Sequence, residues 1–166
     1  MFFPEDLEIQ LHDYLREHVE PKLVEFDAEK TSKRRANDAV QVVDQLAPRI
    51  FNWCKDNNPS LVAGIKGDIE FRSQLAQANS EFELVRDMAK AEKHMRLDRG
   101  SPLVSSSTQI QAKTRGWGEG PYGEGPYGGR EQIVVDLNDG SSRNVYTVVC
   151  AAYRFLQNHM SGIGAT

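Results

Sequence analysis

Apolar side chains recur every three or four residues over most of positions 4–100, which is the spacing that gives a helix one apolar face. The pattern predicts helices over residues 4–28, 32–55, 59–78 and 80–99. Pro21 and Pro48 lie inside the first two stretches, so we expect a kink or a break near each of them. Amphipathic helices of this length predict a bundle in which the apolar faces meet.

The fourth predicted helix has the clearest signals at both ends. Ser80 and Glu83 form the sequence pattern of a capping box, in which each side chain accepts a hydrogen bond from a backbone amide. Gly100 follows as a left-handed helix stop. The apolar stripe consists of Leu84, Met88, Ala91 and Met95. We therefore expect this helix to be the structural centre of the bundle.

The pattern changes after residue 102. Residues 103–114 are rich in Ser and Thr and show no helical stripe, and residues 132–137 alternate in polarity as a strand does. Asn138-Asp139-Gly140 is a strong turn signal, and residues 144–160 return to the helical period. The predicted fold is mainly α, a four- to five-helix bundle with a small antiparallel β-ribbon between the fourth and last helices. We expect a single domain over residues 1–166, with the bundle in 1–100, the ribbon in 103–140, a Gly-rich loop at 115–130 and a C-terminal helix in 144–160.

The composition narrows the classes of function. The 166 residues include 20 Lys and Arg against 24 Asp and Glu, a net charge of −4 that disfavours a general nucleic-acid binder. No stretch approaches the ~20 apolar residues of a membrane span, and the first residues do not form a signal peptide, so we expect a cytoplasmic protein without membrane contact. The two cysteines are far apart and no paired Glu-x-x-His pattern occurs, so we expect neither a metal nor a cofactor.

Residues 118–127 form a tandem Gly-Glu-Gly-Pro-Tyr repeat. Trp117, Tyr122 and Tyr127 recur every five residues and are the candidate binding residues. Their rings could contact a protein partner or stack on unpaired bases, although the glutamates of the repeat would repel phosphate. A third interpretation is a long, mobile connection between two strands. The glycines also spell G-x-G-x-x-G, but no helix follows them, as a dinucleotide site requires.

The polar side of the fourth predicted helix holds the candidate catalytic residues Arg86, Asp87, Lys93 and His94. A histidine titrates near neutral pH and can transfer protons, and an arginine or lysine can stabilise charge that develops on a phosphate. The alternative is a structural role, either as an internal polar stripe or as a solvated, salt-bridged face, because Asp87 and His94 are seven residues apart and share a helix face. We expect the structural role for His94, with its imidazole hydrogen-bonded inside the bundle.

Two resemblances centre on this helix. Residues 86–97 read R-D-x-A-x-x-x-K-H-x-x-L, which resembles a motif in largely uncharacterised helical proteins of bacteria and their phages, where the Lys-His pair also comes late in a central helix. The order of strand, Asp-Gly turn and final helix is similar as well, and this resemblance implies no established activity. Arg86-Asp87 followed by His94 more faintly resembles the signature of the HEPN class of helical ribonucleases and nucleotide-binding domains. That signature places the histidine four to six residues further on, whereas seven residues separate Arg86 from His94 here.

These observations favour a non-enzymatic interaction or accessory protein whose partner is a protein. The alternative is a HEPN-like ribonuclease or toxin-like enzyme that uses the polar face of the fourth helix. The acidic net charge disfavours a nucleic-acid partner without excluding it, and the sequence leaves the oligomeric state open, a dimer included. The enzyme requires Arg86 and His94 to converge in an open cleft, so their geometry distinguishes the two hypotheses.

Overall fold

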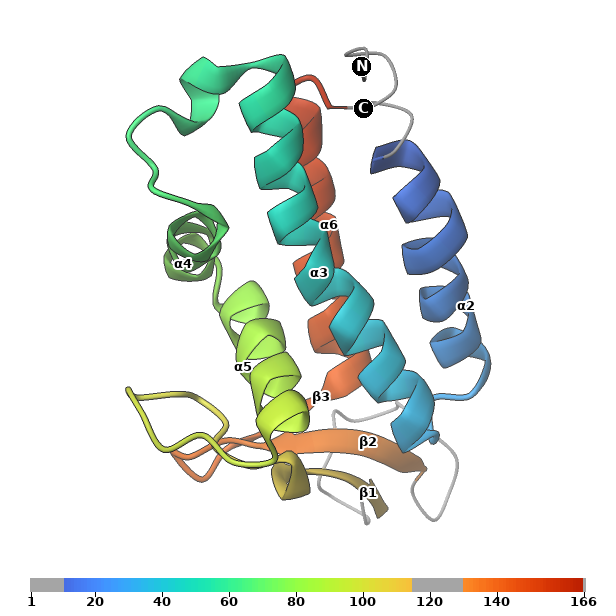
Figure 1. The fold of residues 1–166 in the computed structure, drawn as a ribbon. Helices are drawn as coiled ribbons and strands as arrows, with labels where there is room; N and C mark the ends of the chain where they lie inside the picture. Colours follow the sequence, from blue (N-terminus) through green and yellow to red (C-terminus); the bar gives the residue numbers. More distant parts are fainter. Residues whose placement is uncertain (1–10, 115–129, 166) are drawn as a thin grey trace.

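The computed structural model describes residues 11–114 and 130–165 and is mainly α-helical, as predicted. A small antiparallel sheet lies between the fourth and the last of its five α-helices (Figure 1), so the predicted bundle with an inserted ribbon is confirmed. The helices are α2 (Glu20–Ala28), α3 (Lys33–Asn57), α4 (Asp68–Ala78), α5 (Ser80–His94) and α6 (Val145–Gly162). The strands are β1 (Ile110–Thr114), β2 (Glu131–Asp136) and β3 (Ser142–Asn144).

The core lies between α3, α5 and α6. The two longest helices, α3 and α6, run side by side, and the sheet lies across one end of the bundle (Figure 1). Apolar residues at the helical period bury one face of α3: Ala36, Val40, Val43, Ala47, Ile50 and Cys54. Val148, Ala152 and Leu156 do the same for α6. The buried side chains of all five helices belong to one continuous apolar cluster, whose burial is the main force that stabilises the fold.

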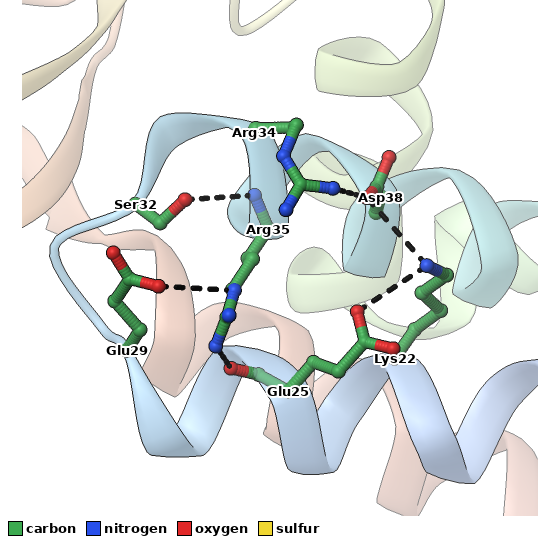
Figure 2. Close-up of polar contacts among 7 residues, drawn as sticks. All are labelled: Lys22, Glu25, Glu29, Ser32, Arg34, Arg35 and Asp38. Carbon is green, nitrogen blue, oxygen red and sulfur yellow. Dashed lines mark hydrogen bonds and ion pairs between the residues drawn. The ribbon is translucent and has the colours of Figure 1, made fainter.

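Polar contacts hold the turn between α2 and α3 (Figure 2). Ser32 caps α3, because its Oγ accepts a hydrogen bond from the backbone N–H of Arg35 at 3.3 Å. The Arg35 side chain reaches back to α2, where Nη1 donates to the carbonyl oxygen of Glu25 at 2.9 Å and Nε pairs with the Glu29 carboxylate at 3.1 Å. Arg35 thereby ties the end of α2 to the start of α3, and a cation at a helix C-terminus is also favoured by the helix dipole.

The first described segment changes its winding before Pro21. The wide π turn η1 (Leu15–Val19) precedes α2, and the N–H of Glu20 bonds the carbonyl of Leu15. Proline has no N–H to donate, and its ring crowds the carbonyl four residues earlier, which here is that of Glu17. A wider turn at that point accommodates both effects. The break expected near Pro21 is therefore a π turn just before that proline. At Pro48 there is no break, since α3 continues through it.

The predicted helix over residues 59–78 is wrong in its first half. A short 3-10 turn, η2 (Pro59–Val62), is followed by an irregular segment, and α4 begins only at Asp68. Gly64 adopts φ +83, a left-handed conformation that ends a helix and that residues other than glycine rarely adopt. The two glycines of this stretch weaken the helix enough for the chain to turn there.

Helix α5 packs against α3, α4 and α6, but the expectation that it forms the structural centre is wrong, because α3 is the helix that packs against all four other α-helices (Figure 1). Both predicted ends of α5 are wrong. The cap is Asn79 instead of Ser80, since the Asn79 Oδ1 accepts a hydrogen bond from the N–H of Phe82 at 2.9 Å. The helix ends at His94, well before Gly100, because Met95 adopts φ 60 and leaves the helical region.

The sheet has three antiparallel strands in the order β1-β2-β3, one more than predicted. Ile110 of β1 pairs with Val135 of β2, and both side chains are buried against the bundle together with Ile133. Asp136 lies on the opposite face and accepts hydrogen bonds from Lys113 Nζ at 2.6 Å, Gln111 Nε2 at 2.8 Å and Ser142 Oγ at 2.5 Å. These donors, Lys113 above all, lower the pKa of Asp136 to about 2. Strand β3 has three residues, too few for an alternation to be recognised.

Candidate functional site

All four candidate catalytic residues are on α5, but the structure places them in three different surroundings. Asp87 is buried, Arg86 is half-buried, and Lys93 and His94 are exposed at the end of the helix. Arg86 and His94 are separated by about 12 Å along the helix axis and by about 80° around it. Within the described chain these two side chains therefore do not converge in one cleft.

Asp87 is a structural acceptor. Its Oδ2 accepts a hydrogen bond from the backbone N–H of Leu103 at 2.8 Å, nine residues beyond the end of α5. Burial raises the pKa of the Asp87 carboxyl, while the Leu103 bond and the charges of Lys90 and Arg86 act in the opposite direction. The carboxylate thus fixes the segment that leaves the helix, and its assignment as a candidate catalytic group finds no support in this position.

Replacing Asp87 with alanine is expected to lower the free energy of unfolding by about 1–3 kcal/mol, because the Leu103 amide loses its acceptor. Asp87→Asn is the matched control, since an amide oxygen can take the same hydrogen bond and should restore most of the loss. Urea unfolding followed by circular dichroism measures both variants. An alanine variant as stable as the wild type would show that this bond contributes nothing.

Arg86 belongs to a polar cluster that also contains Lys90 of α5, Asp44 of α3 and Arg72 of α4, here called the α3–α4–α5 cluster. Arg72 Nη2 donates to both carboxylate oxygens of Asp44 at 2.7 Å. The side chains of Asp44 and Arg72 are only 11% and 19% exposed. The Nε atoms of Arg86 and Arg72 are buried and have no hydrogen-bond partner among the described residues.

The electrostatics of this cluster follow from burial and from charge proximity. Burial raises the pKa of Asp44, and the charges of Arg72, Arg86 and Lys90 partly offset that rise. Burial also lowers the pKa of Lys90, and the neighbouring charge of Arg86 lowers it further. Three half-buried cations therefore act on two buried carboxylates, Asp44 and Asp87, and the one excess positive charge favours an anion.

The end of α5 forms a second polar region, at the surface. Lys93, His94, Met95 and Arg96 are all exposed, so the expected hydrogen bonding of His94 inside the bundle is wrong. The helix ends earlier than expected, and His94 is its last residue. Met95 has φ 60 and ψ −33, and the N–H of Arg96 bonds the carbonyl of His94 at 2.7 Å, which is the geometry of a strained γ-turn.

Residues from other elements surround this turn. The N–H of Ser107 bonds the carbonyl of Met95 at 3.2 Å, and Lys33 Nζ lies 3.5 Å from the carbonyl of Ser107. Lys33, at the start of α3, is thus linked to Met95 through Ser107. We call the exposed residues that meet here the α5-end surface; they are Lys33, Lys93, His94, Met95 and Arg96.

Several site residues escaped the sequence analysis. Asp44, Arg72 and Lys33 come from helices other than α5, and no local motif connects them to it. A signal did exist for Asp44, because it interrupts an otherwise apolar face between Val43 and Leu46. The candidate binding residues Trp117, Tyr122 and Tyr127 lie outside the described residues.

Three further observations complete the description of the site. Over residues 11–114 and 130–165, no three His, Cys, Asp or Glu side chains are grouped so that they could hold a metal ion. None of the helices described is both long and apolar enough to cross a membrane. Comparisons with protein-family models, with curated proteins and with solved structures found no match to this chain.

Proposed function

We propose that this chain is a non-enzymatic interaction protein and that it binds an acidic protein partner through the α5-end surface. The observation that carries the proposal is the exposure of Met95. Its side chain is 73% exposed, the highest value among the exposed large apolar residues of the described chain. A methionine with most of its surface in solvent is available to pack against another molecule.

The backbone at Met95 supports the same interpretation. A residue other than glycine at positive φ is strained, and such strain costs about 1–3 kcal/mol. Met95 is the only such residue among the described ones. The strain is held by the pairing of residues 95–97 with residues 105–107, in which Leu97 N–H bonds the Ser105 carbonyl at 2.7 Å. The fold thus fixes the backbone at Met95, and a preorganised backbone reduces the entropy lost on binding.

The charge around Met95 defines the partner. Lys33, Lys93 and Arg96 are positive, and Asp98 partly neutralises Arg96 at 2.7 Å. A flexible apolar side chain within a rim of cations complements an acidic protein surface that has an apolar centre. The protein as a whole carries a net charge of −4, so the attraction for an acidic partner is confined to this local group of cations.

Photo-crosslinking tests this proposal. A photoreactive amino acid at position 95 is compared with one at position 24, because Val24 is a comparably exposed apolar residue on α2, at 67%. We expect crosslinking in the producing cells to join position 95, and not position 24, to one acidic protein. The purified partner should then bind the wild type at least about tenfold more tightly than the Lys93→Glu variant, since charge reversal introduces repulsion.

Two other results would contradict the proposed interaction, and a third would replace it with another function. Equal crosslinking from both positions, or binding that Lys93→Glu leaves unchanged, would overturn the proposal. Crosslinking to RNA, together with RNA cleavage that His94→Ala abolishes in a folded protein, would replace it with the ribonuclease alternative.

A further inference from the structure

The charges of the α3–α4–α5 cluster are not balanced pair by pair. Both oxygens of Asp44 are already bound by Arg72. Arg86 and Lys90 act electrostatically on Asp44, yet neither forms an ion pair within 4.0 Å of a carboxylate in the described residues. Two half-buried cations, one turn apart on α5, thus have no counter-charge in contact, an arrangement that costs free energy in a folded protein.

The nearby acidic and polar groups do not remove this imbalance. The Asp87 carboxylate accepts the hydrogen bond from Leu103 at 2.8 Å, and its charge offsets part of the charge of Lys90 and Arg86, although no ion pair joins it to either within the described residues. Glu83 lies one turn before Arg86 on α5, and no ion pair joins these two side chains. From α3, the uncharged Gln41 donates its Nε2 hydrogen to the carbonyl of Ala89 at 3.2 Å. The cluster therefore presents three cations from two helices to two carboxylates, Asp44 and Asp87, and retains one excess positive charge.

We propose that this cluster binds the phosphate group of a small ligand, with Arg86 and Lys90 as its main contacts and Arg72 as a third cation. A phosphate group offers several acceptor oxygens, and guanidinium and ammonium groups bind such oxygens through charge-assisted hydrogen bonds. Asp44 holds Arg72 in place through its two 2.7 Å bonds, so this cation is ordered before the ligand arrives. Arg86 and Lys90 are half-buried, so burial strengthens their attraction for an anion while solvent still reaches them.

Calorimetric titration and thermal melting at constant ionic strength test the proposal. Inorganic phosphate is the first probe and glycerol 3-phosphate the second, so that a site for the free ion is distinguished from a site for a phosphate ester. We expect saturable binding of the preferred probe with a Kd on the order of 1 mM. At a tenfold excess over Kd, the Tm should rise by about 4 °C, whereas chloride at the same ionic strength should give no rise.

Variants identify the site. Arg86→Gln and Lys90→Gln should each weaken binding at least about tenfold, since each removes a contacting charge. Arg154→Gln is the matched control, because Arg154 is an exposed arginine on α6, and it should bind as the wild type does. Calorimetry on the folded variants separates lost binding from lost stability. The proposal is overturned if neither probe binds saturably, or if Arg86→Gln binds as tightly as the Arg154→Gln control.

These results are independent of the proposed protein interaction. The phosphate site uses Arg86 and Lys90, whereas the α5-end surface begins at Lys93 on the same helix. Failure of one proposal therefore leaves the other standing.

Discussion

The Met88→Asp variant is expected to be unfolded. Met88 lies in the middle of α5 and is 0% exposed, so an aspartate there would bury a charge among apolar side chains. Such burial costs several kcal/mol, on the scale of the roughly 5–15 kcal/mol that stabilise a typical domain. Circular dichroism should show the helical signal lost or the Tm lowered by more than about 10 °C.

Met95→Asp is the matched control, because it makes the same chemical change on the same segment of chain. Met95 is exposed and has φ 60, a conformation that aspartate adopts more readily than methionine. The stability of this variant should therefore remain within about 0.5 kcal/mol of the wild type. Equal stability of Met88→Asp and Met95→Asp would show that the inward face of α5 has been assigned wrongly.

Arg72→Ala is expected to cost about 3–5 kcal/mol, the typical penalty for removing one partner of a buried ion pair. Asp44 would keep its charge in a buried position, without the two bonds that Arg72 Nη2 provides. The double variant Asp44→Leu with Arg72→Met is the control. It removes both charges and keeps the volume similar, so it should regain most of the lost stability. If the free energy of unfolding of Arg72→Ala lies within about 1 kcal/mol of the wild-type value, Asp44 and Arg72 do not act as a buried ion pair.

The stability lost through Arg72→Ala should become smaller as the pH falls. The pKa of Asp44 is already raised in the folded protein by burial, and removing Arg72, the largest opposing influence, raises it further. The folded variant therefore binds a proton at a higher pH than the unfolded chain, in which an aspartate titrates near about 3.9. As the pH falls from neutral through the raised pKa, protonation removes the unpaired charge, and the variant gains stability relative to the wild type. Urea unfolding at a series of pH values measures the free energy of unfolding of both proteins, and the difference between them should become smaller as the pH falls.

Features of a helix that depend on its own sequence could be predicted. Helix ends that are set by contacts with distant residues could not. The apolar period of α3 predicts its buried face because burial is what its sequence encodes. The helical pattern of α5 continues to Leu97, but the chain leaves the helix at Met95. Residues 95–97 bond instead with Ser105 and Ser107, whose position no short-range signal reveals.

The same distinction applies to the sites. Arg86, Asp87, Lys93 and His94 could be recognised by residue type, because they are polar residues on a well-defined helix. Their roles depended on what surrounds each position: the Leu103 amide for Asp87, and solvent for His94. Arg72 meets Asp44 from a different helix, 28 positions along the chain. Such a pair is a product of tertiary packing, and a single sequence has no periodicity that encodes it.

The packing of α6 against α3 and α5 has a consequence for how the protein is made. α6 packs against α3 and α5, so their apolar faces meet water until residues 145–162 have left the ribosome. Translation adds about 5–20 residues per second, and the stretch from residue 95 to residue 162 therefore takes on the order of several seconds. During that time the nascent chain exposes an incomplete core, which is the kind of surface that chaperones bind and that aggregation begins from.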